Sequence, residues 1–162
     1  MAHVRHFTST GFVIQDGATL LHWHAKVKAW LPPGGHVMEN EDPVEAVLRE
    51  VEEETGVQAE VIPTGGLQVE LSYPTQVQLP LTIMIEDIDD PVAGFHQHID
   101  FIYVCTPLQP VTTLLDGWRW VTQEELASGV ALKRGDGPPE APPEDVRLLG
   151  EQAFQLTMPQ AR

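Results

Sequence analysis

Three glutamates occur at a spacing that places them on one side of a helix. Glu50, Glu53 and Glu54 stand at i, i+3 and i+4, so at about 100° per residue their side chains fall within an arc of about 100°. Like charges at this spacing destabilise a helix slightly. Such a cluster is either a solvated helix face or a site for a cation, and carboxylate oxygens are ligands that suit Mg²⁺ and Mn²⁺. The three glutamates alone leave both interpretations open.

The neighbouring residues predict the helix that carries these carboxylates. Asp42 is a suitable N-cap, Pro43 suits the first helical position, and Glu45 completes a capping box. Gly56 is a typical C-terminal stop. Between the two ends, apolar residues repeat at i, i+3, i+4 and i+7, namely Val44, Val47, Leu48 and Val51. We therefore expect a helix that packs this stripe on a sheet and exposes the glutamates on the opposite side.

A longer pattern surrounds the helix. Gly35 is followed after five residues by Glu41 and, after seven more, by Arg49-Glu50-Val51-Glu52-Glu53-Glu54-Thr55-Gly56-Val57. The segment from Gly35 to Val57 resembles a complete Nudix box. The resemblance continues loosely upstream in residues 30–32, Trp-Leu-Pro, and downstream in residues 118–126, where a Trp-Val strand precedes a short acidic helix.

The resemblance implies a fold, an activity and a set of site residues. The fold class would be α/β, a Nudix-type α/β/α sandwich with a mixed β-sheet, and the reaction would be hydrolysis of a nucleoside diphosphate linked to another moiety. The metal ligands would be the side chains of Glu50, Glu53 and Glu54 and the carbonyl group of Gly34, and the cofactor Mg²⁺ or Mn²⁺. Arg49 would hold the glutamates in place.

Two further residues of the box would act from the loop before the helix. Glu41 would reach the helix from this loop, and Gly35 would let the loop pass close to it. The general base would be a box glutamate or a residue of a later loop, and the sequence does not choose between them. A rival within the same fold is a module that binds nucleotides without cleaving them, although the intact box favours a hydrolase.

The chemistry of such a site follows from charge. A pyrophosphate carries several negative charges that repel an attacking water, and a bound divalent cation neutralises them and lowers the pKa of that water. The carboxylates would therefore serve by holding cations.

Candidate substrate contacts lie outside the box. His22, His24 and Lys26 alternate along a predicted strand, so their side chains share one face that could contact phosphates or could simply be solvated. Tyr73 lies 16 residues beyond Val57, and this resembles the downstream tyrosine of diadenosine polyphosphate hydrolases.

A second His-x-His motif lies later in the chain. His96, His98 and Asp100 share one face of a predicted strand, where His98 and Asp100 could contact substrate. The three side chains are also a plausible Zn²⁺ ligand set. A zinc site here would indicate a different class of protein, in which the acidic helix is ordinary solvated surface. Ordinary polar surface is the third interpretation.

The remaining elements are expected from local patterns. Residues 7–14 and 18–23 read as a β-hairpin, and Thr122 with Glu125 has the spacing of a helix cap. Further β-type stretches are expected over residues 57–71, with a break at 63–66, and over 76–85, 99–106 and 118–121. A loop is expected over 135–143 and a helix over 145–156.

Composition sets the wider limits. The 162 residues suit a single domain over residues 1–162, and the net charge of −15 argues against long nucleic acids and anionic membranes. Residues 35–57 alone contribute −7, so cations bound there could attract a small phosphorylated substrate. The single cysteine, Cys105, and the lack of a long apolar run favour a cytoplasmic location. Exposed edge strands make a homodimer a reasonable expectation.

Overall fold

The structure is a computed structural model that describes residues 4–135 and 137–158. These residues form three helices, α1 (Pro43–Thr55), α2 (Gln123–Ser128) and α3 (Glu144–Thr157). The strands of the main sheet are β1 (Arg5–Gln15), β2 (Ala18–His24), β3 (Ala29–Leu31), β4 (Gly34–His36), β5 (Ala59–Val61), β6 (Thr82–Asp90), β7 (Gly94–Pro107) and β8 (Trp118–Thr122). Two short strands, β9 (Leu132–Arg134) and β10 (Gly137–Glu140), pair separately.

The main sheet is mixed, and β1 and β7 form its centre. These two strands run parallel, with His6 opposite His98 and Thr8 opposite Asp100. All other pairs are antiparallel: β2 and β4 pair with β1, β3 and β8 pair with β2, and β5 and β6 pair with β7. The sheet thus brings β4, which leads into α1, beside the N-terminal half of β1.

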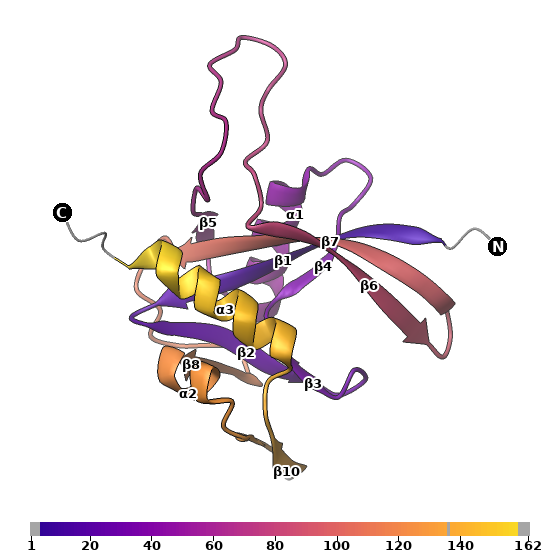
Figure 1. The fold of residues 1–162 in the computed structure, drawn as a ribbon, viewed down its shortest axis with the longest axis vertical. Coiled ribbons are helices and arrows are strands. Elements are labelled where there is room, and N and C mark those ends of the chain that lie inside the picture. The colour runs from indigo at the N-terminus through magenta and orange to yellow at the C-terminus, as the bar shows by residue number, and fades with distance from the viewer. Residues whose placement is uncertain (1–3, 136, 159–162) are drawn as a thin grey trace.

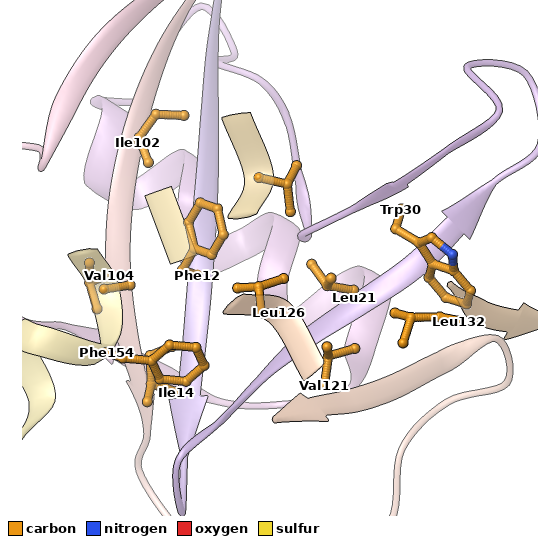
Figure 2. Packing of buried hydrophobic residues seen from close by; sticks show 12 residues of the cluster. Phe12, Ile14, Leu21, Trp30, Ile102, Val104, Val121, Leu126, Leu132 and Phe154 are labelled. Carbon is orange, nitrogen blue, oxygen red and sulfur yellow. The ribbon is translucent and has the colours of Figure 1, made fainter. Parts of the chain in front are cut away.

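Helices cover both faces of this sheet (Figure 1). On one face, Val47 and Val51 of α1 pack in a buried cluster with Val13 of β1. On the other face, Phe12 of β1 and Phe154 of α3 belong to a second buried cluster (Figure 2). Neighbouring residues of β1 point to opposite faces because side chains alternate along a strand. The expected α/β/α sandwich with a mixed sheet is therefore confirmed.

The caps of α1 are those that the sequence predicts. The Asp42 carboxylate accepts hydrogen bonds from the backbone N–H groups of Val44 and Glu45, at 2.8 and 3.0 Å, and the Glu45 carboxylate accepts from the Asp42 N–H. Gly56 ends the helix with φ +74°, a left-handed conformation that favours glycine. The β1–β2 hairpin, β8, the capping box of α2 and helix α3 also confirm the predictions made from local patterns.

Three of the expected loops and strands are wrong. The strand expected over 57–71 is only the short β5, and residues 62–81 form a long connection that projects from the sheet (Figure 1). The strand expected over 76–85 lies at 82–90 instead, because β6 pairs with β7 across the Asp90–Gly94 turn. The loop expected over 135–143 contains β10. In the part of the chain that the structure describes, none of the helices has the length and hydropathy needed to cross a membrane.

Candidate active site

The loop before α1 lies directly against the helix at two glycines. An added Cβ at Gly35 would lie only 2.9 Å from Oε2 of Glu50 and closer still to the rest of that carboxylate, so only glycine leaves room for the carboxylate. The backbone N–H of Gly34 donates a hydrogen bond of 3.0 Å to Oε2 of Glu54. Two of the three clustered glutamates are thus held against β4. The expectation of an exposed acidic face is wrong for Glu50, whose side chain is 14% exposed.

Arg49 connects the loop to the helix. Its Nε and Nη2 donate to the two carboxylate oxygens of Glu41 at 2.6 and 3.0 Å. Its Nη1 donates to Glu50 at 2.8 Å and to Glu53 at 3.1 Å, and Nη2 also donates to the backbone carbonyl of His36 at 3.0 Å. A guanidinium has five N–H donors, and these five bonds engage all of them. Arg49 therefore ties the loop to the helix glutamates and has no donor left for a substrate.

Glu41 belongs to the same scaffold. Its two oxygens accept the hydrogen bonds from Arg49, and Oε2 also accepts one from the backbone N–H of Met38 at 3.0 Å. The hydrogen bonds from Arg49 lower the pKa of Glu41 below its usual range. We therefore place Glu41, like Arg49, among the residues that position the other glutamates.

The remaining three glutamates present free acceptors. Among the described residues, Glu50 Oε2, Glu53 Oε1 and Glu54 Oε1 have no hydrogen-bond donor, while the other oxygen of each carboxylate is bonded. Burial raises the pKa of Glu54, and the nearby charges of Glu50 and Glu53 raise it further. Three carboxylates bond to one guanidinium, and the charges of two of them also act on Glu54, which leaves an excess of negative charge. Hard oxygens with uncompensated charge fit a divalent cation such as Mg²⁺ or Mn²⁺.

Comparison with known proteins gives this arrangement a family. The NUDIX domain family model matches residues 5–143. The chain belongs to the Nudix hydrolase family. A NUDIX-family hydrolase from Clostridium perfringens is 27% identical in sequence and superposes with a TM-score of 0.73, covering 95% of this chain and 99% of that chain.

Two further similarities are partial in coverage or lower in identity. The bis(5'-nucleosyl)-tetraphosphatase [asymmetrical] of Rattus norvegicus is 35% identical over 75 residues, which cover 43% of this chain. The match spans half the length of that relative. The MutT protein from Methanosarcina mazei Go1 is 17% identical with a TM-score of 0.58, and it covers 96% of each chain. This last likeness supports the Nudix fold alone.

The predicted substrate contacts on β2 are only partly brought together. The rings of His22 and His24 lie 5.7 Å apart, and His22 stacks on Trp118 at 4.3 Å between ring centroids. Lys26 lies beyond the end of β2, in the turn before β3, and its Nζ is 3.6 Å from a carboxylate oxygen of Asp90. The expectation that all three side chains share one strand face is therefore wrong for Lys26, because the strand ends at His24.

Tyr73 lies in the long connection between β5 and β6. It is 86% exposed, and within the described parts of the chain it makes no hydrogen bond. The structure does not bring Tyr73 into contact with the Nudix box.

The second His-x-His motif lies on β7 as predicted, but Asp100 is buried. Its two oxygens accept hydrogen bonds from the hydroxyl groups of Thr8, at 3.0 Å, and Thr10, at 2.8 Å. Burial raises the pKa of this carboxyl above its usual range. Asp100 is thus a bonded core group and not a surface ligand. Of the residues described, those that could jointly hold a metal ion here are His6, His96 and His98, so the expected zinc set of His96, His98 and Asp100 is wrong in its third member.

Sequence reasoning missed His6 and His36 as members of this neighbourhood. His6 alternates with Thr8 and Thr10 along β1 and lies opposite His98 in the parallel register, and His36 ends β4 beside them. The alternation of polar residues along β1 was the feature of the sequence that could have drawn attention to His6. The pairing of β1 with β7 joins residues that are about ninety positions apart in the sequence, so no local pattern indicates it.

Proposed function

We propose that this protein is a Mg²⁺- or Mn²⁺-dependent hydrolase of a pyrophosphate bond in a small nucleotide-like molecule. Membership of the Nudix hydrolase family supports the reaction class. The similarity of 75 residues to the rat bis(5'-nucleosyl)-tetraphosphatase supports a nucleoside polyphosphate as substrate, and dinucleoside tetraphosphates are the first compounds to test.

The observation that carries the proposal is the distribution of donors around the box. All five N–H groups of the Arg49 guanidinium donate hydrogen bonds to Glu41, Glu50, Glu53 and a backbone carbonyl. It therefore fixes the glutamates without neutralising their remaining oxygens. An acidic cluster that is held rigidly and keeps an excess of negative charge is suited to hold a cation, whereas a solvated helix face needs no such scaffold.

The roles of the residues follow from their contacts. Glu50, Glu53 and Glu54, with the carbonyl group of Gly34, would hold the cation. When bound, the cation would neutralise charge on the phosphate oxygens and lower the pKa of the attacking water. Arg49 and Glu41 keep the carboxylates in place, and Gly35 lets the loop approach Glu50. One of the free carboxylate oxygens could accept the proton from water, and we leave the general base unassigned.

The surrounding surface gives further proposals. His22 and His24 remain candidate contacts for a phosphate chain, and the exposed Tyr73 a candidate for stacking on a base. With a net charge of −15, the protein would bind small phosphorylated molecules and not long nucleic acids. We further propose one domain over residues 1–162, a cytoplasmic location in keeping with the lone Cys105, and a homodimer formed through exposed strand edges.

The test is a hydrolysis assay on a substrate panel. The panel contains nucleoside triphosphates, sugar nucleotides, dinucleoside polyphosphates and ADP-ribose, each with and without Mg²⁺. Glu53→Gln and Glu54→Gln each remove one charge from the site. Glu52→Gln is the matched control, because Glu52 is exposed on the same helix and its side chain bonds only to Gln58 among the described residues.

The proposal expects Mg²⁺-dependent turnover of at least one substrate, lost in the two site variants and kept in Glu52→Gln. Turnover without metal, or full activity of both site variants, would contradict it. Tight binding of one compound without cleavage would instead identify a nucleotide-binding module. Tyr73→Ala extends the panel, and an increased KM confined to dinucleoside polyphosphates would support a stacking role.

A further inference from the structure

Four imidazole rings gather where the first part of β1 lies between β4 and β7. We call His6, His36, His96 and His98 the histidine cluster. The ring centroids of His6 lie 5.0 Å from those of His96 and 5.3 Å from those of His36, and the His36 and His98 centroids are 5.0 Å apart. The carboxylates of the Nudix box are not members of this cluster. It is a second concentration of metal-binding side chains, made of nitrogen donors.

The spacing of the donor atoms suits one small ion. One ligand nitrogen from each of His6, His96 and His98 lies within 4.8 Å of the others. Nε2 of His96 and Nε2 of His98 are 3.2 Å apart. Two nitrogens bound to a tetrahedral Zn²⁺ at about 2.0 to 2.1 Å lie roughly 3.3 Å from each other. The His96–His98 pair therefore already has the separation of two zinc ligands, and only the third ring needs to move closer.

A hydrogen bond to the backbone orients the ring of His96. Nδ1 of His96 lies 2.9 Å from the carbonyl oxygen of Gly94. A carbonyl oxygen only accepts, so Nδ1 carries the proton and Nε2 keeps its lone pair. Metal-bound histidines commonly donate their other N–H to a carbonyl or carboxylate, which fixes the tautomer and the ring orientation. His96, only 7% exposed, thus has the arrangement of a preorganised ligand.

We propose that His6, His96 and His98 form a Zn²⁺ site that is separate from the carboxylate site of the Nudix box. Neutral imidazoles suit Zn²⁺, whereas the hard oxygens of Glu50, Glu53 and Glu54 suit Mg²⁺. Three protein ligands leave the fourth position of a tetrahedral ion to water. Asp100 takes no part, because hydroxyl groups of β1 already occupy its oxygens. The same chain would thus hold two classes of cation at two places.

The test measures Zn²⁺ binding and needs no turnover. Chelator-treated protein is titrated with Zn²⁺ against a chromophoric competitor, with millimolar Mg²⁺ present to occupy the carboxylate site. The wild type should bind one Zn²⁺ per chain. His98→Gln and His6→Gln should each weaken binding by at least about 100-fold, since loss of a mere supporting contact already costs 10- to 100-fold.

Two kinds of control separate the cluster from other sites. His24→Gln removes a ring from the other His-x-His pair, and Glu53→Gln removes a charge from the box; neither should change the Zn²⁺ affinity. Unchanged affinity in both cluster variants, or loss of Zn²⁺ binding in Glu53→Gln alone, would overturn the proposal. If the cluster variants fail to fold, Co²⁺ is added to the wild type and its visible absorption spectrum is recorded. Intense bands of tetrahedral Co²⁺ that disappear when Zn²⁺ is added would support the site. Weak bands of octahedral Co²⁺ would contradict it.

Discussion

Gly35→Ala should impair the enzyme by displacing a single carboxylate. The added Cβ would occupy the space of the Glu50 carboxylate, which is the end of a flexible side chain and can rotate away. Gly35 does not have a left-handed φ, so alanine can adopt its backbone conformation. The cost is therefore the loss of Glu50 from its place beside Arg49, not a distortion of β4.

The magnitude follows from the contact that is lost. Arg49 Nη1 and Glu50 Oε1 are 2.8 Å apart, with side chains 22% and 14% exposed. A hydrogen bond to a charged group contributes about 1.5 to 3 kcal/mol, so the free energy of unfolding should fall by that amount at most. If the same energy is lost in the transition state, kcat/KM should fall by about 10- to 100-fold, since about 1.4 kcal/mol corresponds to a factor of ten.

The assay is a double-mutant cycle on the free energy of unfolding, with kcat/KM measured for Gly35→Ala alone. In the Glu50→Ala background no carboxylate remains to be displaced, so the added methyl group should cost less than about 0.5 kcal/mol. Wild-type kcat/KM in Gly35→Ala would refute the reasoning. So would a loss of stability that is equally large with and without the Glu50 carboxylate.

Three further outcomes are expected. Arg49→Lys should lower kcat with little change in KM, because an ammonium cannot reproduce the paired hydrogen bonds to Glu41; steady-state kinetics would show it, and a change in KM alone would speak against a positioning role. Burial, with the charges of nearby carboxylates, raises the pKa of Glu86 to about 7, so wild-type stability should decline as the pH rises from about 4.5 through 7. Glu86→Gln should flatten that decline in thermal unfolding followed across pH, and equal slopes would count against the raised pKa. Burial also raises the pKa of Cys105 to about 12, so a thiol reagent should label it only at the rate of unfolding, and fast labelling of native protein would show that the thiol is accessible.

The ends of α1 and the spacing of its glutamates could be predicted from the sequence, because they depend on residues that are close together in the chain. Asp42, Glu45 and Gly56 define both ends of α1 through contacts with residues only a few positions away. The i, i+3 and i+4 spacing of the box glutamates then follows from helix geometry. The resemblance to the Nudix box implied that Arg49 holds the glutamates in place and that Glu41 reaches the helix from the loop, and in the structure an ion pair joins these two residues.

Non-local pairing explains what the sequence could not predict. A strand forms where a partner is available, and the β-type residues between Val61 and Thr82 have no partner over most of their length. Alternation correctly placed His98 and Asp100 on one face of β7, but their surroundings come from β1. The burial of Asp100 between two threonine hydroxyl groups, and the approach of His6, therefore became visible only in the folded chain.

The central claim is that the carboxylates of the Nudix box hold the cation that permits hydrolysis of a pyrophosphate bond. The most direct test follows a dinucleoside tetraphosphate by ³¹P NMR with Glu54→Gln and Glu52→Gln side by side, before and after removal of Mg²⁺. We predict that anhydride resonances are replaced by those of the cleaved products in Glu52→Gln only while Mg²⁺ is present, and that they persist in Glu54→Gln. Equal cleavage by the two variants, or cleavage that continues after Mg²⁺ is removed, would contradict the claim.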